Sequence, residues 1–248
     1  MNVEFLDEGA LTHALQSSYW RVSVLEETTS TQEVLRASNP KHGNLIAAEF
    51  QSAGRGRLDR TFEAAKGKAL LFSFYIEPQC EKVRWSFLPL LVGYTLAGVL
   101  NRETNSHAYS TKWPNDILIN EKKVSGTLVE LAGDGVIVGI GINTHLDLGS
   151  LPVPTATSIA LESNLDISRN KLLLAILDTF ATNLKKWESG ADFLSEYCSA
   201  SSTIDKRVVA QLPDGASREG VATGIAPTGA LLLDEGSQIS VGDVLHLR

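Results

Sequence analysis

The pattern of this chain changes near residue 200, and that change constrains the fold more than any other feature. Before it, apolar runs typical of strands alternate with segments of helical spacing. After it, short strand patterns are separated by tight turns such as Pro213-Asp214-Gly215. We therefore predict an α+β fold, with a mixed β-sheet and flanking helices in a domain of residues 1–200 and a small β-barrel domain in residues 201–248.

The individual elements follow from residue type and spacing. β-branched and aromatic residues predict strands at 19–27, 45–50, 69–77, 116–120, 123–132, 135–143, 207–211, 218–226, 230–233 and 243–247. Helical spacing predicts helices at 31–37, 86–102, 168–187 and 191–199. Ser30 and Glu33 have capping-box spacing, which predicts a side-chain cap at the start of the first helix. The polar segment 199–202 is the expected linker.

The net charge argues against one class of partner. The 248 residues contain 22 lysines and arginines against 29 aspartates and glutamates, which gives a net charge of −7. Broad binding to nucleic acid depends on basic surface, so we expect no nucleic-acid partner. Cys80 and Cys198 are far apart in the sequence, and such sparse cysteine suggests neither a disulfide scaffold nor a metal site.

No targeting or membrane segment is apparent in the sequence. Residues 1–8 are acidic and lack the basic region and apolar run of a signal peptide. The most apolar window, residues 87–100, is too short to span a bilayer and predicts a buried helix. We therefore expect a cytoplasmic protein with no membrane partner.

The segment Gly54-Arg55-Gly56-Arg57-Leu58-Asp59-Arg60 combines glycine and arginine directly after the expected strand 45–50. Glycine lets the backbone approach a ligand closely, and arginine holds phosphate or carboxylate through paired hydrogen bonds. The segment therefore predicts an anion-binding loop. The alternative interpretation is a solvated surface turn.

A second candidate site is Thr111-Lys112-Trp113-Pro114-Asn115-Asp116. Pro114 restricts the backbone, so Lys112 is expected at the end of a stiff extended segment. Asp116 is a candidate to orient Lys112 or to bind Mg²⁺ beside nucleotide phosphates. The alternative is that Asn115 and Asp116 only form a turn.

The run Gly139-Ile140-Gly141-Ile142-Asn143 ends a buried strand. It lacks the third glycine and the following helix of a dinucleotide-binding motif, so its glycines indicate close approach of a ligand or of another part of the chain. Asn143 offers amide donors and an acceptor at the strand end. Ser125-Gly126 lies in a neighbouring strand, where the simplest interpretation is a β-bulge.

Taken in order, these motifs resemble those of biotin–protein ligases. The shared elements are Thr29-Ser30-Thr31-Gln32, the loop from Gly54 to Arg60, Lys112-Trp113-Pro114-Asn115-Asp116, the segment Lys123 to Gly126, and Gly139 to Asn143. The resemblance implies a class II synthetase-like catalytic domain and an SH3-like C-terminal barrel. It also implies ATP-dependent formation of biotinyl-5′-AMP with Mg²⁺, followed by transfer of biotin to a lysine of a biotin carboxyl carrier domain.

The resemblance assigns residues as well. Biotin contacts are implied for Ser30, Thr31, Gln32, Gln51, Gly54, Arg55, Gly56, Arg57, Lys112 and Gly126. ATP or adenylate contacts are implied for Arg55, Arg57, Arg60, Phe62, Trp113, Asn115 and Asn143. Lys112 and Arg57 are the expected catalytic residues, with Lys112 bridging the biotin carboxylate and the α-phosphate. Asp116 is the expected Mg²⁺ ligand.

Two positions depart from the family pattern. Gln32 stands where asparagine is common, and Phe62 stands where tryptophan is usual, so the stacking face is kept but the indole N–H is lost. Only about 28 residues precede the first motif, so the chain resembles family members without an N-terminal DNA-binding domain.

Other functions and assemblies stay open at this point. A lipoate–protein ligase resembles the same architecture, but lipoate lacks the ureido group of biotin. A noncatalytic biotin or nucleotide sensor would not need the lysine and arginines that this chain retains. An exposed strand within residues 124–143 is a candidate to pair with a second copy, so a homodimer is one possible assembly.

Overall fold

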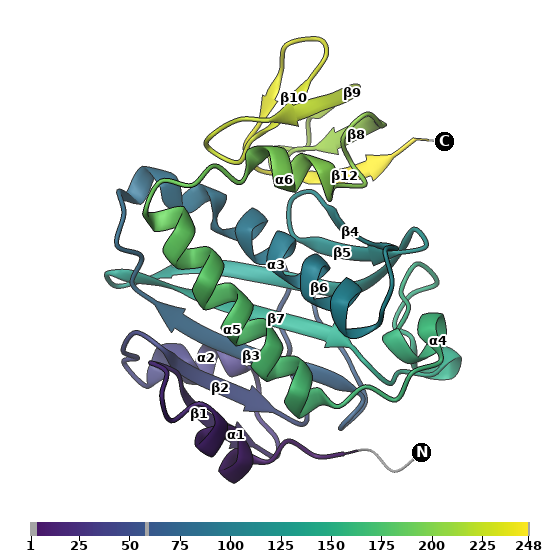
Figure 1. Ribbon diagram of the computed structural model, residues 1–248. Helices are drawn as coiled ribbons and strands as arrows, with labels where there is room; N and C mark the ends of the chain where they lie inside the picture. Colours follow the sequence, from purple (N-terminus) through teal and green to yellow (C-terminus); the bar gives the residue numbers. More distant parts are fainter. Residues whose placement is uncertain (1–3, 58–59, 248) are drawn as a thin grey trace.

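A seven-stranded mixed sheet forms the centre of the larger domain. The computed structural model describes residues 4–57 and 60–247, and Figure 1 shows the sheet between helices. The strand order is β1-β2-β3-β7-β6-β5-β4, with β1 and β2 parallel and the other neighbours antiparallel. These strands are β1 (Arg21–Leu25), β2 (Asn44–Ala48), β3 (Ala69–Ile76), β4 (Tyr109–Lys112), β5 (Asp116–Ile119), β6 (Lys122–Ala132) and β7 (Gly135–Asn143).

Strand β3 is buried along its whole length because helices cover both faces of the sheet. On one face, α3 (Leu88–Glu103) and α5 (Arg169–Glu188) cross the sheet (Figure 1), and the rings of Phe74 and Phe180 are 4.9 Å apart. On the opposite face, Leu35 of α2 (Thr31–Ala37) packs with Tyr75 and Ile137. The candidate functional pocket lies on this second face.

The predicted strands and helices are present, with ends that differ by a few residues. The pattern missed β4 and several other short elements: α1 (Glu8–Ala14), α4 (Ile159–Ser163), β11 (Gln238–Ile239) and the 3₁₀ turns Lys82–Phe87 and Leu148–Ser150. Such short segments contain too few residues for a helical or alternating period to be recognised.

The capping box predicted at the start of α2 is wrong. Ser30 is the N-cap residue by position, but its side chain makes no cap hydrogen bond. The N–H of Thr31 instead donates to Oε1 of Gln51, at 2.7 Å. A side chain from a distant part of the chain therefore satisfies the helix terminus, and it also ties α2 to the pocket.

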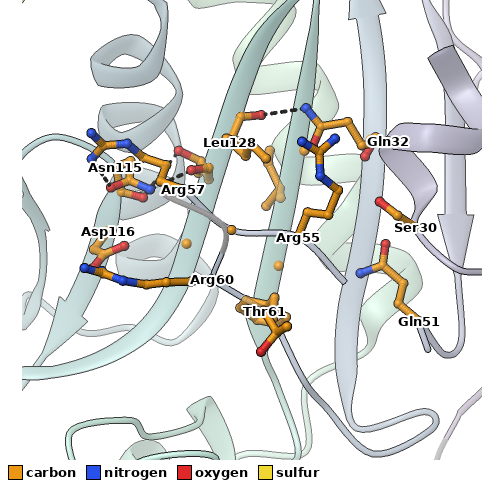
Figure 2. A pocket seen from close by; sticks show the side chains of 18 of the residues that line it. Ser30, Gln32, Gln51, Arg55, Arg57, Arg60, Thr61, Asn115, Asp116 and Leu128 are labelled. Atoms are coloured by element: carbon orange, nitrogen blue, oxygen red, sulfur yellow. Dashed lines mark hydrogen bonds between the residues drawn. The ribbon is translucent and has the colours of Figure 1, made fainter. Parts of the chain in front are cut away.

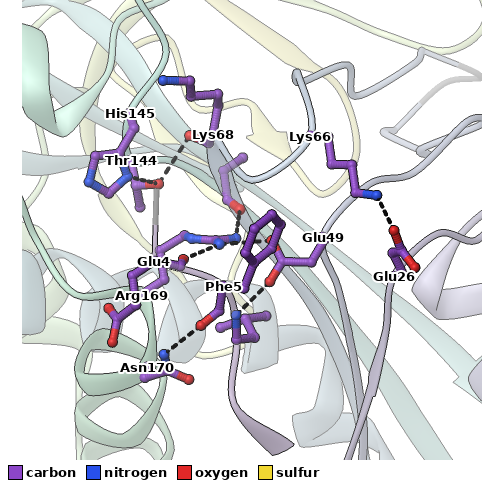
Figure 3. Close-up of polar contacts among 12 residues, drawn as sticks. Glu4, Phe5, Glu26, Glu49, Lys66, Lys68, Thr144, His145, Arg169 and Asn170 are labelled. Carbon is purple, nitrogen blue, oxygen red and sulfur yellow. Dashed lines mark hydrogen bonds and ion pairs between the residues drawn. The ribbon is translucent and has the colours of Figure 1, made fainter. Parts of the chain in front are cut away.

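A buried ion pair anchors the N-terminal segment to the domain (Figure 3). Arg169 and Glu49 are 2.8 Å apart, and their side chains are only 1% and 4% exposed. Arg169 also donates to the carbonyl of Glu4, and Glu49 accepts the N–H of Leu6. Because Glu49 follows β2 directly, this ion pair holds the chain just before Gln51, which lines the candidate pocket.

The C-terminal domain is a five-stranded antiparallel sheet, at the top of Figure 1. Its order is β11-β10-β9-β8-β12, with β8 (Arg207–Gln211), β9 (Ser217–Ile225), β10 (Leu231–Leu233), β11 and β12 (Asp243–His246). The four strands predicted in this region are present, and β11 is additional. Apolar residues of this sheet, such as Val208 and Leu231, belong to the same buried cluster as the core of the larger domain.

The segment predicted as a linker is hydrogen-bonded to the larger domain. Thr111 N–H donates to Ala200 O at 2.8 Å, and Ser202 N–H donates to Thr111 O at 2.8 Å. The indole Nε1 of Trp113, which is 2% exposed, donates to Gly229 O at 2.9 Å. Edge strand β4 and Trp113 therefore fasten the C-terminal sheet to the larger domain. Helix α6 (Leu194–Ser199) comes directly before this junction in the chain.

The helical stretch Lys82–Glu103 is long and apolar enough to pass as a candidate membrane span. However, 67% of its apolar window is buried inside the fold, as in the core helix of a globular protein. Its apolar residues pack in the hydrophobic core between α5 and the sheet.

Candidate functional site

The main candidate pocket lies where α2, the segment after β2, strands β6 and β7, and the C-terminal sheet meet (Figure 2). It gathers most of the residues singled out from the sequence. The lining includes Ser30, Thr31, Gln32, Gln51, Arg55, Gly56, Arg57, Arg60, Phe62, Asn115, Asp116 and Gly126. Segments that are far apart in the sequence thus form one site.

One end of the pocket is polar, neutral and closely hydrogen-bonded. Oε1 of Gln51 accepts the N–H of Thr31 at 2.7 Å and its hydroxyl at 3.0 Å. The Thr31 hydroxyl also lies 2.8 Å from that of Ser73 on β3. Because the Gln51 carbonyl is engaged in this way, its NH₂ group, which lies beside Gly54, is the part that can donate to a ligand.

Gln32 has the opposite orientation. Its Nε2 donates to Oε2 of Glu130 at 2.8 Å and to Leu128 O at 3.4 Å. Both amide hydrogens are therefore used, and Oε1 is left as an acceptor beside Gly139. The two glutamines thus present a donor and an acceptor to the same pocket.

The two glycines of β7 give room to side chains that line the pocket. A Cβ at Gly139 would lie 2.5 Å from Gln32 Oε1, and one at Gly141 would lie 2.6 Å from the ring of Phe62. The close approach predicted from these glycines is therefore made by side chains of this chain. Phe62 needs the flat surface at Gly141, which no larger residue leaves free.

The two ends of the glycine–arginine segment are joined by backbone hydrogen bonds. Phe62 N–H donates to Gly54 O at 2.9 Å, and Gly56 N–H donates to Arg60 O at 2.7 Å. A Cβ at Gly54 would lie 2.2 Å from Phe62 O, so only glycine fits where the two strands of the loop meet. Leu58 and Asp59 of the predicted motif lie outside the described residues.

Each cation that lines the pocket is paired with a carboxylate from another element. Arg55 lies beside Gln32 (Figure 2) and donates to Oε1 of Glu130 at 3.1 Å. At the other end of the pocket, Oδ1 of Asp116 lies 2.6 Å from Lys123 Nζ. Asp243 of β12 binds Arg57 at 3.5 Å and also contacts Arg60. Burial lowers the pKa of the Arg57 guanidinium, and Asp243 opposes that shift.

Arg57 is the most extensively held of the loop arginines. It donates to Asn115 Oδ1 at 3.2 Å and to Gly242 O at 3.1 Å, in addition to its contact with Asp243. Its side chain is 19% exposed, whereas that of Arg60 is 64% exposed. The C-terminal sheet therefore helps to position the arginine loop.

Four residues expected at the site do not line this pocket. They are Gly54, Lys112, Trp113 and Asn143. Lys112 pairs with Asp116 across β4 and β5, one strand further out, and burial lowers the pKa of its amine. The Trp113 ring is used at the domain junction, and Asn143 donates to Thr157 O at 3.0 Å.

Several lining residues were missed by the reading of the sequence: Thr61, Ser73, Lys123, Thr127, Leu128, Gly139, Ile140, Gly141 and Asp243. The sequence did point to Lys123, because this residue begins the Lys123 to Gly126 motif. It also pointed to Gly139 and Gly141, because glycines in a strand indicate close approach of another group. It did not point to Asp243, since this residue is brought to the loop only by packing of the C-terminal sheet.

A shift in strand pairing decides how Lys123 is oriented. Leu118 pairs with Lys123 and Ile117 with Ser125, so Val124 has no partner on β5. This irregularity puts Lys123 on the same face as Asp116 and Gly126. The bulge proposed at Ser125-Gly126 is thus present one residue earlier.

The second half of β6 has an open edge. β5 pairs with β6 only as far as Gly126, and Thr127 N–H donates to Asn115 O at 2.9 Å. Beyond Thr127, no strand in the described part of the chain pairs with this side of β6, and Leu131 is 71% exposed. β7 lies between β3 and β6, so of the two predicted strands only β6 has a free edge.

The donor set for a metal is limited. Within residues 4–57 and 60–247, no group of three or more His, Cys, Asp or Glu side chains is placed to hold a metal ion. Asp116 and Asp243 are the carboxylates that line the pocket. Two carboxylates suit Mg²⁺ when substrate phosphates complete its coordination, and they do not form a protein-only metal site.

Comparison with known families matches both parts of the chain. Residues 22–147 match the model of the biotin/lipoate A/B protein ligase family. Residues 203–247 match the biotin protein ligase C-terminal domain. The resemblance inferred from the motifs is thereby confirmed.

Individual relatives agree with the family match. The chain is 32% identical to biotin--[acetyl-CoA-carboxylase] ligase of Mycobacterium tuberculosis, over 98% of this chain and 96% of the relative. It is 30% identical to the bifunctional ligase/repressor BirA of Escherichia coli, over 92% of this chain and 74% of the relative. Among solved structures, a biotin protein ligase from Aquifex aeolicus in complex with biotin and ATP is 32% identical to this chain, with a TM-score of 0.81. The match covers 92% of this chain and 99% of that chain. The predicted fold class is confirmed.

Proposed function

The chain belongs to the biotin/lipoate A/B protein ligase family, and from this premise we propose that it is a biotin–protein ligase. In the first step, a carboxylate oxygen of biotin attacks the α-phosphorus of ATP, which forms biotinyl-5′-AMP and releases pyrophosphate. In the second step, the amine of an acceptor lysine attacks the acyl carbon. An amide bond forms, AMP leaves, and the amine loses a proton.

The observation that carries this proposal is the pair of oppositely oriented glutamines at the neutral end of the pocket. A ureido group has one carbonyl acceptor and two N–H donors. Gln51 offers NH₂ because Thr31 engages its carbonyl, at 2.7 Å from the Thr31 nitrogen. Gln32 offers its carbonyl because Glu130 engages its NH₂, at 2.8 Å. This end is complementary to the ureido ring of biotin.

The cationic end supports the chemistry of the first step. A carboxylate and a triphosphate repel each other, so their approach requires positive charge positioned in advance. Arg57, Arg60 and Lys123 line this end, and we infer that substrate anions replace the carboxylates of Asp243 and Asp116 as their partners. Lys123 is the lysine that lies nearest to the reacting atoms in this proposal.

Lys112 and the adenylate contacts remain proposals from the sequence. Lys112 faces Asp116 in register and adds charge at the rim of the pocket. Asn115 and Phe62 line the pocket and are available to the nucleotide, whereas Trp113 and Asn143 would act from outside its lining. Mg²⁺ would arrive with ATP, neutralise its phosphates and be held by Asp116.

The acceptor in this proposal is a biotin carboxyl carrier domain in the cytoplasm. The free edge of β6 next to the pocket supports strand addition, either by that domain or by a second copy of this chain. A homodimer that uses this edge would hide it from the carrier, so assembly and acceptor binding would compete.

The decisive experiment mixes the protein with ATP, Mg²⁺, biotin and a biotin carboxyl carrier domain. We expect one biotinyl group on a single lysine of the carrier, detected by mass spectrometry, and no product without ATP. Biotin binding without modification of the carrier would instead support a noncatalytic sensor.

The closest alternative is a lipoate–protein ligase, because the family model includes both kinds of enzyme. Lipoate cannot use the paired donor and acceptor of Gln51 and Gln32, since it has no ureido group. Calorimetry with the two acids separates these functions. We expect biotin to bind at least about 100-fold more tightly, because lipoate would leave buried polar groups without partners. Tighter lipoate binding would reverse the assignment.

A further inference from the structure

Glu130 lies behind the pocket and contacts two of the residues that line it. It is on β6 and does not line the pocket itself. Its carboxylate accepts hydrogen bonds from Gln32 at 2.8 Å, Arg55 at 3.1 Å and Arg36 at 3.1 Å. Gln32 and Arg36 are four residues apart on the same face of α2, so one carboxylate joins α2, the arginine loop and β6.

The chemistry of Glu130 determines the orientation of the Gln32 amide. An ionised carboxylate only accepts hydrogen bonds, so the amide must turn its NH₂ toward Glu130. The second hydrogen points to Leu128 O, at 3.4 Å. Gln32 is 3% exposed, and its oxygen lies against Gly139, a residue of the pocket wall.

A neutral amide at position 130 would weaken the constraint on the orientation of the Gln32 amide. A glutamine at 130 offers both a donor and an acceptor, so only the longer contact with Leu128 O, at 3.4 Å, would still favour the present orientation of the Gln32 amide. In the flipped orientation Gln32 would present NH₂ to the pocket, where Gln51 already presents a donor. A ureido N–H would then have no acceptor and would lose its hydrogen bond.

We propose that Glu130 is a positioning residue for biotin: through its hydrogen bond to Gln32 it makes that side chain an acceptor for a ureido N–H. The proposal rests on the function proposed above and adds a determinant of substrate specificity to it. Glu130 acts on ground-state binding of biotin, because it touches neither the reacting carboxylate nor the phosphates.

The test compares Glu130→Gln with Arg36→Ala by calorimetry with biotin in the absence of ATP. Arg36→Ala is the matched control, since it removes another ion pair of the same carboxylate at a residue outside the pocket lining. We expect Glu130→Gln to weaken biotin binding about tenfold and Arg36→Ala less than about twofold. The maximal rate of adenylate formation at saturating biotin should stay within about threefold for Glu130→Gln.

A double-mutant cycle with Gln32→Ala shows whether the effect passes through Gln32. In the Gln32→Ala background, Glu130→Gln should weaken biotin binding by no more than about threefold, because the amide it orients is gone. A further readout is the side-chain NH₂ signal of Gln32 by NMR, which should shift in Glu130→Gln and stay in place in Arg36→Ala.

Three results would overturn the inference while leaving the proposed function intact: wild-type biotin affinity in Glu130→Gln, equal losses in Glu130→Gln and Arg36→Ala, or additive effects in the cycle. Each would mean that Glu130 only braces α2 or the loop. Wild-type protein that binds no biotin would overturn both this inference and the proposed function.

Discussion

The two ends of the pocket are held together by different interactions. At the neutral end, the buried Thr31 and Ser73 and the half-buried Gln51 form a hydrogen-bonded group that joins α2, β3 and the segment after β2. At the cationic end, partly exposed arginines and Lys123 are held by carboxylates, one of which comes from the C-terminal sheet. The first end is a preformed hydrogen-bonded site, which we propose takes the ureido ring, and the second is a site whose charges can change partners.

This difference has an energetic consequence. Buried hydrogen bonds among neutral groups are costly to break and insensitive to salt. Exposed ion pairs contribute little to stability and weaken as ionic strength rises. The neutral end should therefore decide which acid binds, whereas the cationic end should decide how fast it reacts and how long the product is retained.

The largest expected effect belongs to Lys123→Ala. Its amine lies in the pocket, and losing a charge directed at the reacting phosphate should lower pyrophosphate exchange about 100-fold or more. Lys112→Ala is the matched comparison from one strand further out, with an expected loss of about tenfold. A greater loss in Lys112→Ala would give the bridging role to Lys112, as the sequence motif predicts.

The next largest effect is expected for Arg57→Gly. Arg57 ties the loop to Asn115 and to the C-terminal sheet, so its loss should speed release of biotinyl-5′-AMP about 30-fold. Arg60→Gly is the control on the same loop, and its exposed side chain predicts a smaller change. Release is measured by trapping the free adenylate. Equal rates in wild type and Arg57→Gly would mean that the loop does not retain the intermediate.

At the neutral end, Thr31→Val should weaken biotin binding about tenfold. It removes the hydroxyl that holds Gln51 Oε1, at 3.0 Å, and leaves Ser73 without this partner. The defect should not change between low and high salt, whereas ATP binding to the wild type should weaken as salt rises. Calorimetry at two ionic strengths measures both, and a salt-dependent Thr31→Val defect would break the distinction between the two ends.

The smallest expected effect is that of Trp113→Phe. This change removes the indole bond to Gly229 O and should lower stability by about 1 kcal/mol, measured by denaturant unfolding. Because Asp243 comes from the sheet that Trp113 fastens, the KM for ATP should rise about threefold while biotin affinity stays unchanged. A large rise in the KM for ATP without loss of stability would favour the direct adenylate contact predicted from the sequence.

Much of the fold could be predicted because it depends on local pattern. The near-continuous apolar run of β3 requires burial on both faces, and the helical spacing of α5 requires a core on one side. The ordered motifs also located the arginine loop and the strands β5 to β7. Short elements such as β4 were missed because four residues show no period.

The choice between the two lysines could not be made in this way. Lys112 and Lys123 both belong to motifs, and residue type favours neither. A shift of one residue in the pairing of β5 and β6 at Val124 puts Lys123 on the face of the pocket. Regular alternation would have turned it toward α3, because side chains point to opposite faces in turn.

The amino-acid sequence thus sufficed for the family, the order of the main elements and the position of the arginine loop, because each depends on residues close together in the chain. The partners of that loop depend on packing. Glu130 follows Arg55 by 75 residues and Asp243 follows Arg57 by 186, and no local pattern links them. Folding the sheet and fastening the C-terminal domain bring these carboxylates to the arginines, and they also fix which atoms the two glutamines present to a ligand.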